Sequence, residues 1–320
     1  MPRIARKKKK LTADTLTIPR DYSLVKDGIT QSLITKFLTC RKSFLFAINK
    51  LTGGNKAKTT NFGSLCHFIL ADLYGVTKKQ MLSFAIDAST LAYYKEENPN
   101  IDAQQKERDS GMAGVVMQEY IEFYKKDFER NKYDKTEQEF NLALLPIRRR
   151  GKIDGGYLTI KKPYRRWLVE HKTKGRVVED ALVSHLSIDF QNLYYITNYE
   201  LDTGETVSGM LYDVIRNPQI KQGKNQSFKD FCDRVQADIK DRPDFYFMRW
   251  EVPYTKKDKL TFKNELIRIE EDIQFACVSE NFYKNTTACL GMFTCEYLHA
   301  CTTNNLDCLT KKEKLFSELE

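Results

Sequence analysis

The sequence predicts an α/β protein whose mixed central sheet is flanked by helices. Residues 137–145 alternate between polar and apolar side chains, as a strand with one buried face does. Further strand-like segments follow at residues 148–156, 157–160, 167–172 and 206–215. Between the last two of these, residues 180–202 have the pattern of a helix. Strands interrupted by one helix are typical of a mixed sheet with helices packed on its faces.

Helices are also predicted on both sides of this central region. Residues 30–51 place apolar side chains near the 3.6-residue period of a helix, and Ser64 suits the cap of a second helix. Residues 76–135 are polar and helix-like, which predicts a helical insertion. Residues 245–252 are expected to form an outer strand, and residues 260–278 an amphipathic helix.

The length of 320 residues is enough for one large domain. We expect a single domain over residues 21–310, preceded by a flexible basic arm at residues 1–20 and followed by a charged tail at residues 311–320. Within the domain, residues 218–243 are polar and predict a loop-rich insertion, and residues 277–308 form a cysteine-containing segment.

The composition favours a soluble globular protein, with 41% apolar and 30% charged residues. The formal charge is +9, and the first ten residues contribute six basic side chains and no acid. Such a run either contacts nucleic acid or serves only solubility. No stretch reaches the roughly 18 apolar residues of a membrane helix, and no secretory signal is recognisable. We therefore expect a cytoplasmic protein with no membrane partner.

An acidic cluster is the strongest chemical signal in the sequence. Asp154 ends one predicted strand, and Glu170 and Lys172 lie two residues apart on the next, so these two side chains share a face. If the two strands pair, Asp154 can join them. Two converging carboxylates form a hard oxygen site that suits Mg²⁺ or Mn²⁺, and the carbonyl of His171 could supply a third ligand.

Such a site suits the hydrolysis of a phosphodiester. A bound ion can lower the pKa of a water molecule and hold a phosphate oxygen, and Lys172 would position that water or neutralise the charge of the transition state. The alternative interpretation is an ordinary surface pair of Glu170 and Lys172 on an edge strand.

The pattern Asp154…Glu170-His171-Lys172 resembles the core motif of the PD-(D/E)XK nucleases, specifically their RecB-like exonuclease branch. That branch includes CRISPR-associated RecB-like exonucleases, bacterial helicase–nuclease subunits and phage recombination nucleases. Further similar features follow the family's order, namely Ser32…Phe37…Cys40…Phe44, Gly63…His67, Gln191…Tyr195, and Cys289, Cys295 and Cys301. The resemblance spans residues 30–305 and implies a restriction-endonuclease-like fold.

The resemblance also implies roles for single residues outside the core motif. His67 would be a metal ligand, although it could instead be a histidine packed on an apolar helix. Gln191 and Tyr195, four residues apart on one helical face, would contact DNA and the active-site network, or else lie at the edge of the core. Glu139 would contact the metal or orient Lys172, or face solvent.

The cysteines point to a second centre. The chain has eight, and five of them lie in the last 44 residues. The resemblance implies that Cys40, Cys289, Cys295 and Cys301 hold a [4Fe-4S] cluster. Zinc is the main rival, because four thiolates also suit zinc. In a third interpretation they are reduced cysteines that act as small apolar residues.

Together these features predict a Mg²⁺- or Mn²⁺-dependent deoxyribonuclease. Its DNA substrate would be linear ends or single strands, in recombination, repair or phage DNA metabolism, and a helicase or recombination protein could be its partner. Two alternatives remain. One is a non-catalytic DNA-binding or recombination scaffold of the same fold, and the other is a restriction-type endonuclease.

Overall fold

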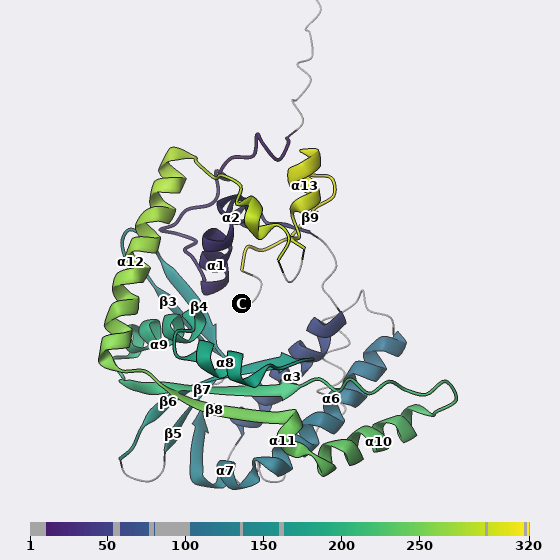
Figure 1. Cartoon of the computed structure of the whole chain (residues 1–320). Helices are drawn as coiled ribbons and strands as arrows, with labels where there is room; N and C mark the ends of the chain where they lie inside the picture. Colours follow the sequence, from purple (N-terminus) through teal and green to yellow (C-terminus); the bar gives the residue numbers. More distant parts are fainter. Residues whose placement is uncertain are drawn as a thin grey trace, which may run out of the picture. The chain divides into compact units, whose positions relative to one another are not determined.

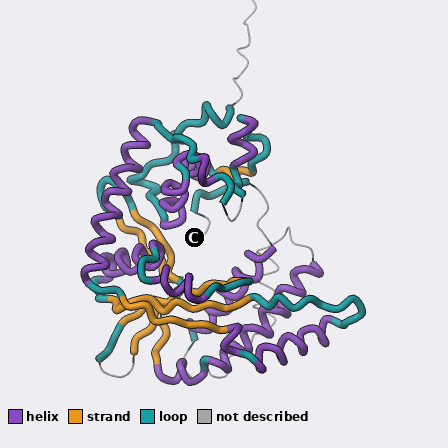
Figure 2. Tube along the Cα trace, viewed as in Figure 1, coloured by secondary structure: helices purple, strands orange, loops and turns teal. Residues whose placement is uncertain are grey.

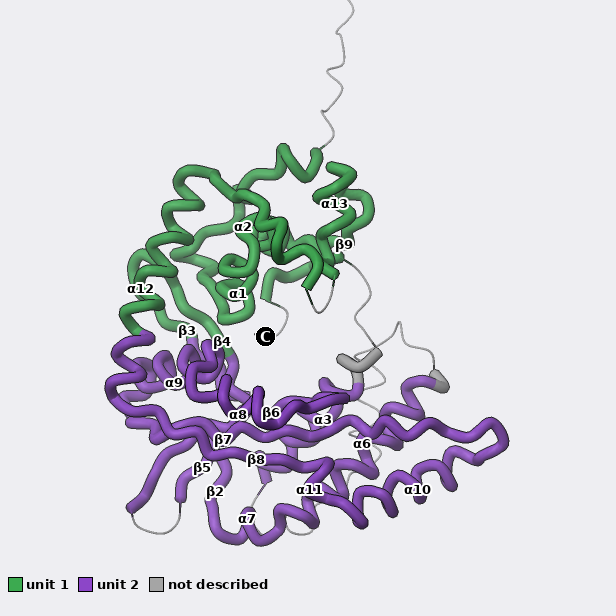
Figure 3. Tube along the Cα trace, viewed as in Figure 1, with its two compact units in different colours: residues 1–55, 141–151, 263–320 green, residues 56–140, 152–262 purple. Residues whose placement is uncertain are grey.

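The computed structural model describes residues 11–53, 58–76, 80, 103–134, 137–159, 163–291, 294–316 and 319. The basic run at residues 1–10 and a large part of the predicted helical insertion lie outside the described residues. The chain divides into two compact units (Figure 3). Unit 1 is Met1–Asn55, Asn141–Gly151 and Lys263–Glu320, and unit 2 is Lys56–Phe140 and Lys152–Phe262. The single-domain organisation stays a prediction.

Unit 2 is built on a mixed sheet of five strands in the order β2-β5-β6-β7-β8 (Figures 1 and 2). The strands are β2 (Asn131–Asp134), β5 (Gly155–Thr159), β6 (Arg166–Lys174), β7 (Val207–Arg216) and β8 (Phe247–Pro253). Strands β6 and β7 are parallel, whereas the other neighbours are antiparallel. The predicted mixed central sheet flanked by helices is confirmed.

The crossover between β6 and β7 carries two helices, α8 (Glu179–Leu186) and α9 (Phe190–Thr203). The prediction of one continuous helix over residues 180–202 is therefore wrong, because the helix is interrupted at residues 187–189. Asp189 lies between the two helices with an extended backbone, and its side chain accepts a hydrogen bond from the Asn192 N–H, so it begins a new helix. Helix α9 ends at Gly204, whose φ of 72° suits glycine.

The helices on the opposite face of the sheet share one apolar core. They are α3 (Lys58–Gly75), α6 (Ala103–Phe123), α7 (Lys125–Arg130), α10 (Phe228–Asp241) and α11 (Pro243–Tyr246). The loop-rich prediction for residues 218–243 is wrong for α10, because Phe231, Val235 and Ile239 recur every fourth residue and are buried in this core. Residues 131–134, predicted as part of a helical insertion, instead form the edge strand β2.

Unit 1 contains the short helices α1 (Gln31–Thr39) and α2 (Arg41–Ile48), so the single helix predicted over residues 30–51 is broken. The break is at Cys40, whose backbone is extended. The other elements of this unit are β1 (Leu51–Thr52), η1 (Thr286–Ala288), α13 (Leu298–Thr303) and β9 (Thr310–Lys311). Strands β1 and β9 pair antiparallel, which joins two distant segments of the chain.

Three elements lie where the chain passes between the units. Helix α12 (Lys256–Ser279) confirms the predicted amphipathic helix and begins a few residues earlier. Strands β3 (Gln138–Leu142) and β4 (Arg149–Ile153) pair in a separate two-stranded sheet, so their predicted place in the central sheet is wrong. In the described part of the chain, no helix has the length and apolar character needed to cross a bilayer.

Candidate active site

The strands of unit 2 bring the predicted acidic cluster together. Asp154 is the one residue between β4 and β5, and β5 is antiparallel to β6, which carries Glu170 and Lys172. The Oδ2 atom of Asp154 accepts a hydrogen bond of 2.8 Å from the backbone N–H of His171. Because alternate residues of a strand share a face, Glu170 and Lys172 project together from β6. The spacing in the sequence therefore indicated the observed arrangement.

Glu170, Lys172, Gln191 and Tyr195 form one polar cluster. The ammonium group of Lys172 is paired with Glu170 Oε1 and lies 3.1 Å from Gln191 Oε1. The amide nitrogen of Gln191 is 2.8 Å from Glu170 Oε1 and 3.3 Å from the hydroxyl of Tyr195. Gln191 therefore reaches the core carboxylate, and Tyr195, four residues later on the same helix face, contacts Gln191. Tyr194 is fully buried and lies outside these contacts.

His67 approaches this cluster from α3. Its Nδ1 atom lies 3.5 Å from Asp154 Oδ1. Gly63, one turn earlier on the helix, allows a close approach to β6, because a Cβ atom there would lie only 2.6 Å from the Thr173 hydroxyl. Gly63 thus allows α3 to pack closely against β6, and this close packing places His67 beside Asp154.

Glu137 completes a group that could hold a metal ion. Ligand atoms of His67, Glu137 and Asp154 all lie within 4.8 Å of one another. Glu137 precedes β3 with a φ of 50°, an uncommon conformation outside glycine, and its N–H donates to the Asp154 carbonyl over 3.2 Å. Its carboxylate is also paired with Lys152 at 2.5 Å. A metal contact was predicted for Glu139 instead, but that side chain is exposed and is not part of this group.

The two core carboxyl groups differ in their electrostatics. Burial raises the pKa of Glu170 to about 7, even though Lys172 opposes the shift. Burial would also raise the pKa of Asp154, but His67 and Lys172 outweigh it and hold that pKa well below its usual range. Asp154 is therefore an anion at neutral pH, whereas Glu170 binds a proton readily. A nearby cation would displace that proton.

The hydrogen bonding around Glu170 tests whether a cation fits. This carboxyl group is 2% exposed, and its Oε2 atom is buried without a hydrogen-bond partner among the described residues. A buried carboxylate oxygen usually has a partner, and a metal ion would supply one. The carboxylates of Asp154 and Glu137 and the imidazole of His67 are suitable additional donors. The group of His67, Glu137 and Asp154 therefore fits a divalent cation, and Glu170 lies outside that group of atoms within 4.8 Å.

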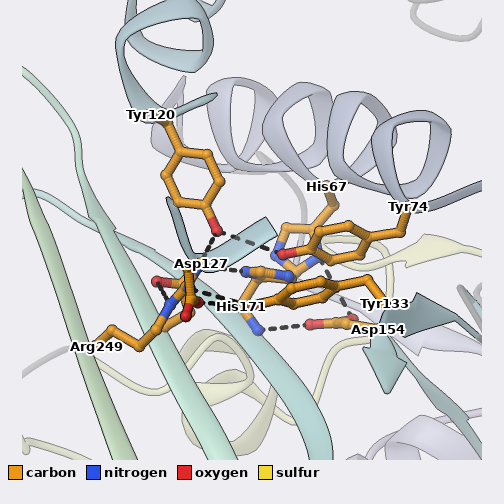
Figure 4. Close-up of polar contacts among 9 residues, drawn as sticks. His67, Tyr74, Tyr120, Asp127, Tyr133, Asp154, His171 and Arg249 are labelled. Carbon is orange, nitrogen blue, oxygen red and sulfur yellow. Dashed lines mark hydrogen bonds and ion pairs between the residues drawn. The ribbon is translucent and has the colours of Figure 1, made fainter. Parts of the chain in front are cut away.

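His171, the remaining predicted ligand, is nearly fully buried within β6. Its ring lies between the α3 side chains His67 and Tyr74 and the sheet, with ring centroids 6.2 and 5.5 Å away, respectively (Figure 4). Its backbone amide holds Asp154, as described above. The predicted role of its carbonyl as a metal ligand stays a prediction.

In unit 1, the four predicted cysteines line a single cavity of about 240 Å³. Cys40 lies at the break between α1 and α2, and its sulfur accepts a hydrogen bond of 3.3 Å from the Asn285 N–H. Cys289 follows η1, Cys295 lies in a loop, and Cys301 belongs to α13. Burial raises the pKa of the Cys295 thiol, and nearby Cys289 and Cys40 add to the shift. Distant segments of the chain thus bring four cysteines to the wall of one cavity.

Comparisons with known proteins assign no family. No family model matches the sequence, and no curated protein does. Among solved structures, one crystal structure from Eubacterium rectale, described as a "Putative exonuclease", has 13% sequence identity and a TM-score of 0.49. The similarity covers 97% of this chain and 98% of that one. A likeness this distant assigns no activity, so a functional conclusion must come from the site.

Proposed function

We propose that this protein is a metal-dependent nuclease that hydrolyses phosphodiester bonds in DNA. The observation that carries the proposal is the meeting of Asp154, Glu170 and Lys172 at neighbouring strands, with His67 beside Asp154. Hydrolysis of an anionic ester requires both an activated nucleophile and neutralisation of charge. A site with two acids, a lysine and an imidazole can supply both. A purely structural ion pair would need neither Gln191 nor His67.

The residues that would hold the metal are His67, Asp154 and Glu170, with Glu137 as a fourth and the His171 carbonyl as a fifth. A Mg²⁺ or Mn²⁺ ion bound there would lower the pKa of a water molecule and neutralise phosphate charge. The imidazole of His67 favours Mn²⁺ over Mg²⁺, because Mg²⁺ strongly prefers oxygen ligands.

The protein's own side chains would orient the reactants. Lys172 would align the attacking water and neutralise the charge that grows on the phosphate oxygens. Gln191 accepts from Lys172 and donates to Glu170, so it holds both groups in place. Tyr195 would fix Gln191 in turn, through their contact of 3.3 Å.

The preference for DNA ends or single strands rests on the resemblance to RecB-like exonucleases. Contacts of Lys172 and a metal ion would go to the phosphate backbone, so base identity should matter little. The scaffold and restriction-type alternatives, as well as a helicase or recombination partner, have no separate support in the geometry.

We further propose that the cysteine cavity holds a [4Fe-4S] cluster. The four cysteines come from separate segments of the chain and line one cavity of about 240 Å³. Four thiolates are the full ligand set of such a cluster. Its visible absorbance after purification without oxygen, together with iron and zinc analysis, separates the cluster from zinc and from free thiols.

The test of the nuclease proposal is release of nucleotides from linear single- and double-stranded DNA and from closed circles, with Mg²⁺ or Mn²⁺. We expect metal-dependent release from linear DNA, lost in Lys172→Ala. The matched control is Lys174→Ala, which removes the same charge two residues further along β6. Cleavage of circles would favour the restriction-type alternative. If folded, metal-loaded wild-type protein releases nothing, the scaffold alternative replaces the proposal.

A further inference from the structure

A row of buried charged side chains crosses the sheet of unit 2. His171 on β6 is the register partner of Asp213 on β7, and Asp213 is the partner of Arg249 on β8. The side chains of His171 and Asp213 are 2% and 0% exposed, and that of Arg249 is 9% exposed. Because strand residues alternate between faces, this row lies on the face opposite Glu170 and Lys172.

The row is connected by direct polar contacts. His171 Nδ1 lies 2.9 Å from Asp213 Oδ2, and Arg249 Nε lies 3.2 Å from Asp213 Oδ1. The hydroxyl of Tyr120 donates to the same carboxylate. Burial alone would raise the pKa of Asp213, but Arg249 and His171 hold it below its usual range, so the group is an anion. Asp213 therefore accepts hydrogen bonds from Tyr120 and Arg249, while His171 Nδ1 lies close to it without the geometry of a hydrogen bond.

Arg249 is itself held in place. Its guanidinium group is paired with Asp127, lies 3.2 Å from the Tyr133 hydroxyl, and packs 3.6 Å from the centre of the Tyr124 ring. Side chains from α7, β2 and the loop before α7 thus fix the far end of the row. A buried set of charges contributes little net stability, because desolvation offsets the attraction, and apolar residues of similar volume serve a core equally well. Core packing alone does not account for it.

The near end of the row reaches the candidate metal site through the backbone. The amide of His171 donates to Asp154 Oδ2 over 2.8 Å, while its ring is held by Asp213. A ring fixed at Nδ1 restrains rotation of its own peptide unit along β6. That peptide separates Glu170 from Lys172 and carries the hydrogen bond to Asp154.

We propose that Asp213, supported by Arg249, is a positioning residue that fixes His171 so that the His171 amide orients Asp154 for metal binding. The inference rests on the proposed metal-dependent function. Partners one step removed from a metal change its affinity by about 10- to 100-fold when they are lost. Metal affinity is therefore the property that this row should control.

Two variants test the row, and a third is the control. His171→Phe keeps the backbone amide and a ring of similar size but removes Nδ1, and it leaves Asp213 paired with Arg249. Asp213→Asn keeps the shape and removes the charge. Glu200→Gln removes the charge from a partly buried ion pair elsewhere in unit 2, Glu200 with Lys259 at 2.6 Å.

The measurement is Mn²⁺ binding to the full chain, followed by electron paramagnetic resonance of free Mn²⁺, at a temperature well below every variant's Tm. Only Mn²⁺ binding that is lost in the Asp154→Ala variant is counted as binding to the candidate site. We expect His171→Phe and Asp213→Asn to raise the Kd by about 10-fold or more. Glu200→Gln should leave the Kd within about twofold while lowering Tm, because it disturbs only packing.

The inference is overturned if folded His171→Phe binds Mn²⁺ as tightly as wild type, or if Glu200→Gln weakens binding equally. If Asp213→Asn does not fold, His171→Phe decides alone. A wild-type protein that binds no Mn²⁺ at an Asp154-dependent site overturns the proposed metal site itself, and the positioning role with it. These failures are distinguishable, because the last one is seen without any variant of the row.

Discussion

The acidic site of unit 2 and the cysteine cavity of unit 1 are built in different ways. Strand β6 carries Glu170 and Lys172, and long helices carry His67 and Gln191. Hydrogen bonds already link Glu170, Lys172 and Gln191, and Asp154 is held by the His171 amide. The cysteines lie instead at a helix break, a 3₁₀ turn, a loop and a short helix. Strand register fixes side chains without a ligand, whereas loops depend on what they bind. The acidic site should therefore persist without its metal, and the cysteine cavity should depend on its bound group.

The largest expected effect is on catalysis without loss of fold. Asp154→Ala should lower nucleotide release at least about 100-fold, because both the metal ligand and the partner of His67 are lost. Its circular dichroism and Tm should stay close to those of wild type, since sheet pairing positions the site. A Tm that falls sharply would mean that the acidic site is not preformed, and the contrast between the regions would fail.

The cysteine cavity should show the reverse behaviour. Cys301→Ser should remove most of the bound iron and lower the Tm by at least about 5 °C, since a structural metal centre contributes folding free energy. Cys308→Ser, an exposed cysteine of the same unit, is the matched control and should change neither. Equal iron content in the two variants would contradict the proposed ligand set.

Within the acidic site, a comparison of Glu137 with Glu139 tests which glutamate is a metal ligand. Glu137→Gln should weaken Mn²⁺ binding about 10-fold, because it removes a carboxylate from the ligand group. Glu139→Gln makes the same chemical change two residues away at an exposed position and should have no effect. Isothermal titration of both variants decides. If Glu139→Gln is the weaker binder, the group has been assigned to the wrong residue.

The smallest expected effect is on acid stability. The pKa of Asp213 is lowered from 3.8, so its carboxylate stabilises the fold above about pH 4, and that contribution is lost as the pH falls further. Wild type should lose unfolding free energy steeply below pH 4, and Asp213→Asn should lose it less steeply from a lower starting value. Denaturant unfolding at several pH values checks this, and parallel slopes would argue against an ionised Asp213.

The acidic core was predictable because it depends on short-range rules. The two-residue spacing of Glu170 and Lys172 specifies a shared strand face, and the four-residue spacing of Gln191 and Tyr195 specifies a shared helix face. Asp154 needed only the pairing of adjacent strands. Local hydrophobic patterns also predicted strands at β5, β6, β7 and β8 with a helical crossover before β7, which is why the mixed sheet could be predicted.

The missed features depend on conformations or contacts that periodicity does not encode. Glu137 lies in the group of candidate metal ligands because its backbone adopts a left-handed conformation before β3. The alternation of polar and apolar residues in the sequence does not distinguish Glu137 from Glu139. The helix breaks at Cys40 although the apolar residues continue at helical spacing on both sides of it. The hydrogen-bond partner of the Cys40 sulfur, Asn285, lies far along the chain. The row of His171, Asp213 and Arg249 required the register of three strands, which no single segment shows.

The most direct test of the metal site is anomalous diffraction from crystals soaked in Mn²⁺. The account predicts a peak within coordination distance, about 2.0–2.6 Å, of His67, Asp154 and Glu170, with Glu137 released from Lys152 toward it. The peak should be absent from Asp154→Ala crystals. A peak elsewhere in unit 2, or no peak under conditions where the protein releases nucleotides from DNA, would contradict the proposal that these residues form its metal centre.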